Sequence, residues 1–63
     1  MDILEIDGRR WVGVADAAQV VGRPPVTVYK AREADRIAWK FLAGRYFVDL
    51  DEARALWPPK AEQ

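Results

Sequence analysis

The stretch from residue 14 to residue 37 most constrains what this chain can fold into. Four apolar residues at positions i, i+3, i+4 and i+7 place one apolar side on a helix: Val14, Ala17, Ala18 and Val21. Gly22 follows where a left-handed residue ends a helix. Two prolines come next, and the second, Pro25, suits the first position of a new helix. We therefore predict two helices joined by a tight turn, the second running from about Pro25 to Asp35, which is the geometry of a helix-turn-helix.

The second predicted helix is weakly apolar. Val28 and Ala31 face inward, with Arg32 at the edge of that stripe. The opposite face carries Val26, Tyr29, Lys30 and Glu33, with Thr27 and Ala34 beside them. We also expect Arg32 and Arg36 to pair with Asp35 or Glu33. A helix kept only for packing usually carries a broader apolar stripe, so we expect the polar face to have a binding role.

The residues before the first helix predict a hairpin. Ile3 to Ile6 and Arg9 to Val12 flank Asp7-Gly8, and Asp-Gly is a strong turn pair because both positions need positive φ. The alternative is a loosely ordered N-terminal arm. Gly13 then serves as a tolerable N-cap, and the following helix carries Asp16 in its first turn, where an acidic residue suits the macrodipole.

A second hairpin is predicted after the two helices. Trp39, Phe41 and Ala43 alternate with Lys40 and Leu42, and Tyr46 to Val48 form a second short run. Gly44-Arg45 between them is a two-residue loop with glycine first, as a type II′ turn prefers. A basic hairpin directly after a helix-turn-helix is typical of a wing.

The chain is then predicted to end in a capped helix. Asp49 and Glu52 have the spacing of a capping box. The apolar side of this helix carries Leu50, Ala53, Leu56 and Trp57. Pro58-Pro59 stops the helix, and residues 58–63 form a frayed tail. No internal repeat is expected, and residues 1–63 form one domain.

The composition restricts both the core and the chemistry. A chain of 63 residues without cysteine or histidine must build its core from apolar packing, and a zinc site is not expected. We assign the large aromatic residues to that core rather than to a platform for single-stranded nucleic acid: Trp11, Trp39, Phe47 and Trp57. Without the usual bases and thiol nucleophiles, and without a phosphate-binding glycine loop, the chain is expected to be a non-enzyme that needs no cofactor.

The formal net charge is zero, but the charges are unevenly distributed. The segment from Arg23 to Arg45 holds six basic and two acidic residues, a net +4, whereas the first seven residues and residues 49–52 each contribute −3. This asymmetry indicates one basic face; the alternative is ordinary solvated charge. No apolar run approaches the roughly 20 residues of a membrane span, and the acidic N-terminus is not a signal peptide, so we expect a cytoplasmic protein.

These elements together resemble the excisionase-like branch of the MerR-type winged helix-turn-helix family, over about Trp11 to Trp57. The matching pieces are Trp11-Val12, Asp16-Ala17-Ala18-Gln19-Val20-Val21-Gly22, Thr27-Val28-Tyr29-Lys30 and Gly44-Arg45-Tyr46-Phe47-Val48-Asp49. The chain departs from the family at Pro24-Pro25, where Ser or Thr usually begins the second helix, and at Asp35, where a glycine often ends it. The resemblance implies a small α+β winged fold that binds double-stranded DNA.

The expected DNA contacts lie on the second helix, the turn and the wing. They are Arg23, Thr27, Tyr29, Lys30, Arg32, Glu33, Arg45 and Tyr46. Lys30 can donate to guanine and Glu33 can accept from cytosine. The other side chains suit phosphate or minor-groove contacts, with Tyr46 supporting Arg45 and with Arg32 packing its stem on the core edge and its head at a phosphate. Arg9 and Arg10 are expected to be ordinary surface charges.

Three roles remain open at this point. The resemblance and the compact length favour a phage recombination directionality factor, which binds DNA together with a recombinase or with further copies of itself. A small transcriptional repressor or activator is the second possibility, and the resemblance also extends to phage terminase small subunits. The third possibility is a protein-interaction module without DNA binding, which the zero net charge favours. No membrane or small-molecule ligand is expected.

Overall fold

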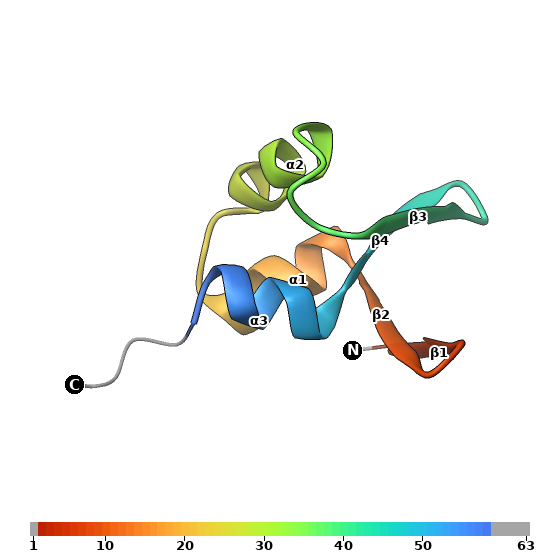
Figure 1. The fold of residues 1–63 in the computed structure, drawn as a ribbon. Helices are drawn as coiled ribbons and strands as arrows, with labels where there is room; N and C mark the ends of the chain where they lie inside the picture. Colours follow the sequence, from red (N-terminus) through yellow and green to blue (C-terminus); the bar gives the residue numbers. More distant parts are fainter. Residues whose placement is uncertain (1, 59–63) are drawn as a thin grey trace.

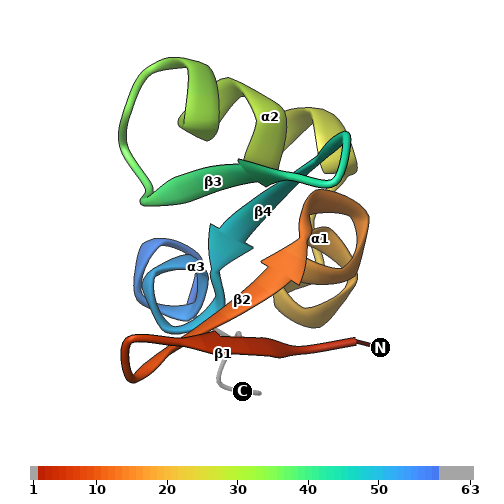
Figure 2. The same cartoon turned by 90° about the vertical axis from the view of Figure 1, so that its right-hand side faces the viewer.

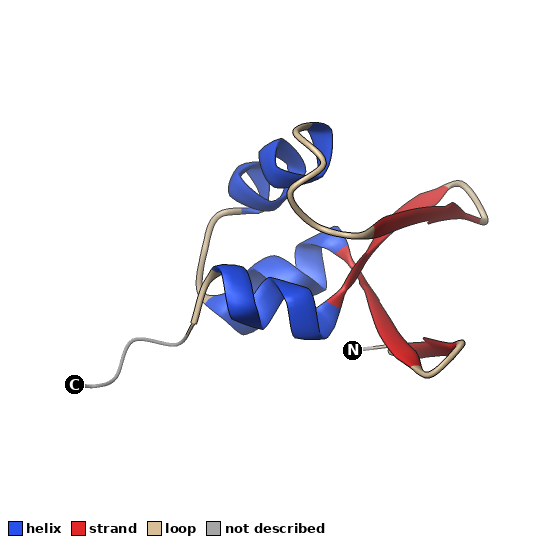
Figure 3. Cartoon of the chain, viewed as in Figure 1, coloured by secondary structure: helices blue, strands red, loops and turns tan. Residues whose placement is uncertain are grey.

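The computed structural model describes residues 2–58 as a small α+β domain with three helices and one antiparallel sheet (Figure 1). The elements are β1 (Leu4–Ile6), β2 (Arg9–Gly13), α1 (Val14–Val21), α2 (Pro25–Glu33), β3 (Trp39–Leu42), β4 (Arg45–Asp49) and α3 (Leu50–Leu56). The strand order is β1-β2-β4-β3, so two hairpins are joined through their inner strands. The helices gather on one side, and the hairpins project from the other (Figure 3). Within this part of the chain, no helix is long and apolar enough to cross a membrane.

The core lies between the middle of the sheet and the helices. At its centre Val12 of β2 pairs with Val48 of β4, and neither side chain is exposed to solvent. The buried cluster around them comprises Val14, Ala17, Ala18, Val28, Ala31, Ile37, Leu50 and Ala53. α1 buries the apolar side predicted for it, whereas α2 contributes only Val28 and Ala31. The predicted inward faces of both helices are therefore confirmed.

Left-handed residues end the first two helices. Gly22 has φ 68°, and the Arg23 N–H donates to the carbonyl of Ala18 at 3.0 Å. α2 stops at Glu33, two residues earlier than predicted, because Asp35 takes the same left-handed conformation with φ 55°. The next amide, of Arg36, donates back to the carbonyl of Ala31 at 2.9 Å. Asp35 thus fills the place of the missing glycine.

Both hairpins form, with one correction to the predicted turns. Asp7 and Gly8 have φ 55° and 77°, so the N-terminal segment is a hairpin rather than a loose arm. In the second hairpin the turn residues are Ala43 and Gly44, with φ 51° and 76°. The predicted Gly44-Arg45 loop was wrong by one residue. Both central positions have positive φ, as in a type I′ turn, which matches the right-handed twist of the strands.

The two hairpins and their following helices form an internal structural repeat, so the expectation that the chain contains no repeat was wrong. β1-β2-α1 and β3-β4-α3 have the same order, the same turn conformation and, in β2 and β4, the same pattern of burial. Equivalent residues are Gly8 and Gly44, Arg9 and Arg45, Trp11 and Phe47, Val12 and Val48, and Ala17 and Ala53. Val12 pairs with its own equivalent, so an approximate twofold axis passes through this pair. Figure 2 shows β2 and β4 at the centre, β1 and β3 outside them, and α1 and α3 on opposite sides.

Candidate nucleic-acid interface

α2 presents a polar outer face in the structure. Val26 and Tyr29 are 55% and 43% exposed, and Lys30 and Glu33 are exposed beside them, while Thr27 is partly buried. Among the described residues Lys30 makes no ion pair, and Glu33 comes only within 3.9 Å of Nη2 of Arg32. The predicted pairs of Arg36 with Glu33 or Asp35 do not form in this part of the chain. Of the two side chains expected to reach DNA bases, Lys30 is therefore not held by an ion pair in the described chain, and Glu33 makes only a long one with Arg32.

Arg32 does not present its head to solvent as predicted. Its side chain is 15% exposed, and the guanidinium carbon lies 4.0 Å from the centre of the Tyr46 ring and 5.4 Å from that of Trp39. The buried Nε has no hydrogen-bond partner. The planar guanidinium stacks on aromatic faces because it is weakly hydrated and cationic. The Arg32 guanidinium thus connects α2 to the β3–β4 hairpin, and its phosphate contact stays a prediction.

Trp39 was predicted to belong to the core, but it lies outside the core. The side chain is 38% exposed, packs edge-on against Tyr46 at 5.7 Å, and donates from Nε1 to Oδ1 of Asp35 at 3.2 Å. It belongs to an edge strand that no other strand covers. The other large aromatic residues follow the prediction more closely: Trp11 and Phe47 are buried, and Trp57 packs partly buried against the core.

Arg45 lies in the first position of β4, opposite Leu42, rather than at the tip of the turn. A cavity of about 230 Å³ beside it is lined by Val14, Ala15, Tyr29, Gly44, Arg45 and Tyr46. The fold thus brings together three predicted site residues from α2 and β4. Thr27 and Lys30 line a different hollow, with Arg36 and Trp57, and Arg23 lies exposed in the connection between α1 and α2.

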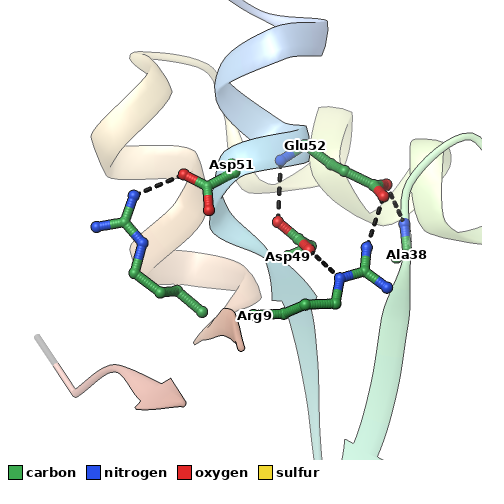
Figure 4. Close-up of polar contacts among 6 residues, drawn as sticks. Arg9, Ala38, Asp49, Asp51 and Glu52 are labelled. Carbon is green, nitrogen blue, oxygen red and sulfur yellow. Dashed lines mark hydrogen bonds and ion pairs between the residues drawn. The ribbon is translucent and has the colours of Figure 1, made fainter. Parts of the chain in front are cut away.

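Sequence reasoning missed the roles of Arg9 and Arg10, which bind the acidic residues at the start of α3; Figure 4 shows Arg9 with Asp49 and Glu52. Nε of Arg9 lies 2.6 Å from Oδ2 of Asp49, and its Nη2 lies 2.7 Å from Oε2 of Glu52. Arg10 reaches Asp51 at 2.6 Å, and this hydrogen bond holds the pKa of the Asp51 carboxyl below its usual value. The partners are some forty residues apart, so only the pairing of β2 with β4 could have revealed them.

Only one of the two hydrogen bonds of the predicted capping box forms. Oδ1 of Asp49 accepts a hydrogen bond from the Glu52 N–H at 3.0 Å, which caps α3. The Glu52 carboxylate does not accept a hydrogen bond from the Asp49 N–H, because that N–H donates to the Ala38 carbonyl. Glu52 instead accepts from the Ala38 N–H at 2.8 Å. Glu52 thereby anchors the segment between α2 and β3 to the start of α3.

These ion pairs leave several cations of the described chain without an acidic partner. The acidic residues of the α3 start are matched by Arg9 and Arg10. In contrast, the cations of the α2 and hairpin region have no carboxylate within salt-bridge distance among residues 2–58: Arg23, Lys30, Arg36, Lys40 and Arg45. Lys40 lies over the Trp11 ring at 5.0 Å. This region is suited to an anionic partner; a site of three or more metal-binding side chains is not found in the described part.

Comparisons of the chain with protein-family models, with curated proteins and with solved structures found no match.

Proposed function

We propose that the chain is a sequence-specific double-stranded DNA-binding protein of the winged helix-turn-helix type. α2 would enter the major groove, and the β3–β4 hairpin would act as a wing on the backbone or in the minor groove. The observation that carries this proposal is the polar outer face of α2 beside a hairpin, both bearing cations without ion-pair partners in the described chain. The acidic start of α3 does not offset them, because Arg9 and Arg10 already bind it.

The contacts divide into base readout and backbone contacts. Lys30 donates to guanine and Glu33 accepts from cytosine, since both are exposed on the same face of α2. Backbone contacts come from the connection, the edge of α2 and the wing: Arg23, Thr27, Tyr29, Arg45 and Tyr46. Arg32 is assigned a supporting role, because its guanidinium is covered by Tyr46 and Trp39.

Among DNA-binding roles, we favour an excisionase-like recombination directionality factor that acts in the cytoplasm of a bacterial or phage-infected cell, with a recombinase or further copies as partners. A small transcriptional regulator of the same fold is the second candidate. A protein-interaction module is favoured by one observation, the 55% exposure of Phe41 beside the exposed Trp39. The proposal is for a binding protein and not for an enzyme, because the sequence has neither the histidine nor the cysteine that most often serves as a base or nucleophile.

The test is a titration with attachment-site and promoter duplexes at 50 and 200 mM salt. We expect affinity to fall with salt at a log–log slope near −0.9 per phosphate neutralised. Lys30→Ala should cost about 1–3 kcal/mol at the specific site and relax one base position. Arg54→Ala, which removes an exposed cation from α3, is the matched control and should keep the sequence preference. Repeated sites near the attachment core support the excisionase role, a single promoter palindrome supports the regulator, and absence of binding at low salt refutes DNA binding.

A further inference from the structure

The internal repeat places two equivalent arginines in the same local setting. Arg9 and Arg45 each follow the glycine of a turn and begin an inner strand. Each guanidinium lies over the aromatic ring two residues further on, at 5.1 Å from Trp11 and at 5.4 Å from Phe47. The fold therefore presents the same side chain twice, once on each side of the approximate twofold axis.

The two arginines differ in what faces them. Arg9 reaches across to Asp49 and Glu52, which lie at the N-cap and in the first turn of α3. The equivalents of these two acidic residues beside Arg45 are Gly13 and Asp16. Glycine has no carboxylate, and aspartate is one methylene shorter than glutamate. Among residues 2–58, Arg45 accordingly forms no salt bridge.

The geometry around Gly13 leaves room for a side chain once the end of the Arg45 side chain shifts by a few tenths of an ångström. A Cβ at this position would lie 3.1 Å from Nη2 of Arg45 and 3.9 Å from Oδ2 of Asp16, and both atoms are the ends of flexible side chains. Gly13 has φ −60° and ψ 155°, which any residue adopts. The backbone conformation at position 13 therefore does not require glycine.

We propose that Gly13 is a binding-determining position: the side chain it lacks leaves Arg45 free to bind a backbone phosphate of the DNA ligand. The inference rests on the proposed function and deepens it. Arg45 is an exposed residue, and its guanidinium suits a phosphate because its fork of donors matches two phosphate oxygens. Tyr29 lines the same cavity of about 230 Å³ and adds a hydroxyl donor from α2. One phosphate held there contacts both the wing and the second helix.

The inference makes stability and binding change in opposite directions. Gly13→Asp supplies the missing equivalent of Asp49, which caps α1 and pairs with Arg45. The melting temperature should therefore rise. The same ion pair competes with phosphate, so duplex affinity should fall by about tenfold and the salt slope should flatten by roughly one unit. A loss of binding in a more stable protein cannot be attributed to unfolding.

The matched control is Gly13→Asn, which has nearly the same size and N-cap preference but no charge. It should raise the melting temperature and bind duplex within about twofold of the parent, because no new ion pair forms. Arg45→Gln should lose affinity as Gly13→Asp does, whereas Arg10→Gln, which removes the same charge elsewhere, should not. Parent-like binding by Gly13→Asp, or an equal loss with Gly13→Asn, would overturn the inference.

A second readout separates the failure of this inference from failure of the proposed function. Inorganic phosphate should shift the Arg45 Nε–H resonance in the parent chain but not in Gly13→Asp. A parent chain that binds no duplex while its Arg45 responds to phosphate would refute DNA binding and support the phosphate site. An Arg45 resonance that does not respond to phosphate would overturn the inference itself.

Discussion

At the residue scale, three arginines of this chain have three roles that follow from their neighbours. Arg9 is bound by two carboxylates, Arg32 is enclosed by two aromatic rings, and Arg45 is free of acidic partners in the described chain. The sequence alone presents them as equal positive charges. Their partners come from distant elements, so each role is decided by the fold.

Arg32→Met tests the enclosed arginine. Methionine keeps the apolar stem but removes the guanidinium that packs on Tyr46 and Trp39. We expect the free energy of unfolding to fall by about 1 kcal/mol, since a partly desolvated cation–π contact is worth roughly 0.5–2 kcal/mol and removing the unpartnered Nε offsets part of that loss. Urea denaturation measures the change. Arg36→Met, an exposed control, should stay within about 0.5 kcal/mol.

The same Arg32→Met variant distinguishes a supporting role from a phosphate contact. Because the guanidinium is covered, the salt slope of duplex binding should stay that of the parent, while the fluorescence of the neighbouring Trp39 should change. If the salt slope of Arg32→Met is flatter than that of the parent by one unit, Arg32 contacts a phosphate, as the sequence predicted.

Acid titration tests the exposed ion pair of Arg10 and Asp51. The hydrogen bond from Arg10 lowers the pKa of Asp51 below its unfolded value. The pair therefore stabilises the fold above the unfolded pKa of about 3.9, and this contribution is lost as the pH falls from there through the folded pKa. Carbon NMR of the Asp51 carboxyl measures the shift. In Arg10→Gln the pKa should return toward its ordinary value, and an unchanged titration would show that Arg10 is not the cause.

At the scale of elements, the two turns have the same backbone but different residues. Asp7-Gly8 carries a residue that tolerates positive φ, whereas Ala43 adopts φ 51° without that tolerance. The hairpin that bears Arg45 is therefore the more strained of the two. Replacing Ala43, the first residue of this turn, should stabilise the β3–β4 hairpin without changing the core.

Ala43→Asn places Asn-Gly in the type I′ turn, the pair that such turns prefer. We expect a gain of about 1 kcal/mol, which corresponds to roughly 4–8 °C in the melting temperature of a domain of this size. Differential scanning calorimetry measures it. Ala55→Asn in α3, where φ is helical, is the control and should destabilise. A lower melting temperature for Ala43→Asn would contradict the assigned turn.

Local patterns were sufficient to predict most elements. The spacing of Val14, Ala17 and Ala18 gave the buried face of α1, and Asp7-Gly8 gave the first turn, because each depends on residues a few positions apart. Local patterns could not give the end of α2 at Glu33. There the left-handed Asp35 is supported by Trp39 from the following strand.

The candidate site was predictable only in part, for the same reason. The outward face of α2 follows from the inward spacing of Val28 and Ala31. The enclosure of Arg32, and the relation of Arg45 to Gly13, depend on how α2 and β2 meet β4. These contacts join residues that are far apart in the sequence, and no local sequence pattern indicates them. They can be recognised only once the pairing of the strands is known.

At the scale of the whole molecule, the apolar core follows the approximate twofold axis, whereas the charged side chains do not. The two halves contribute equivalent residues to one core, with Val12 and Val48 at its centre. Their charges are not equivalent, since Arg9 is paired and Arg45 is free in the described chain. A symmetric framework thereby carries an asymmetric distribution of charge, and α2, which joins the two halves in the chain, lies on one side of the other helices (Figure 1).

The symmetry of the core can be tested with Val12→Ala and Val48→Ala. Both side chains are fully buried and face each other, so each truncation removes similar apolar surface and leaves a similar cavity. We expect each to lower the free energy of unfolding by about 2–3 kcal/mol, and the two losses to agree within about 0.5 kcal/mol. Val26→Ala, at a 55% exposed position, should change it by less than about 0.5 kcal/mol.

The double variant tests whether the halves fold as one unit. A 63-residue chain has a total stability of roughly 3–9 kcal/mol, so losing both valines, about 4–6 kcal/mol together, should remove most of it. For the single variants, unfolding followed by circular dichroism and by tryptophan fluorescence should coincide, since β2 and β4 join the halves through this pair. Separate transitions, or a loss at Val12 several times that at Val48, would mean that one half folds first and supports the other. In that case the twofold axis would describe the shape of the molecule but not its energetics.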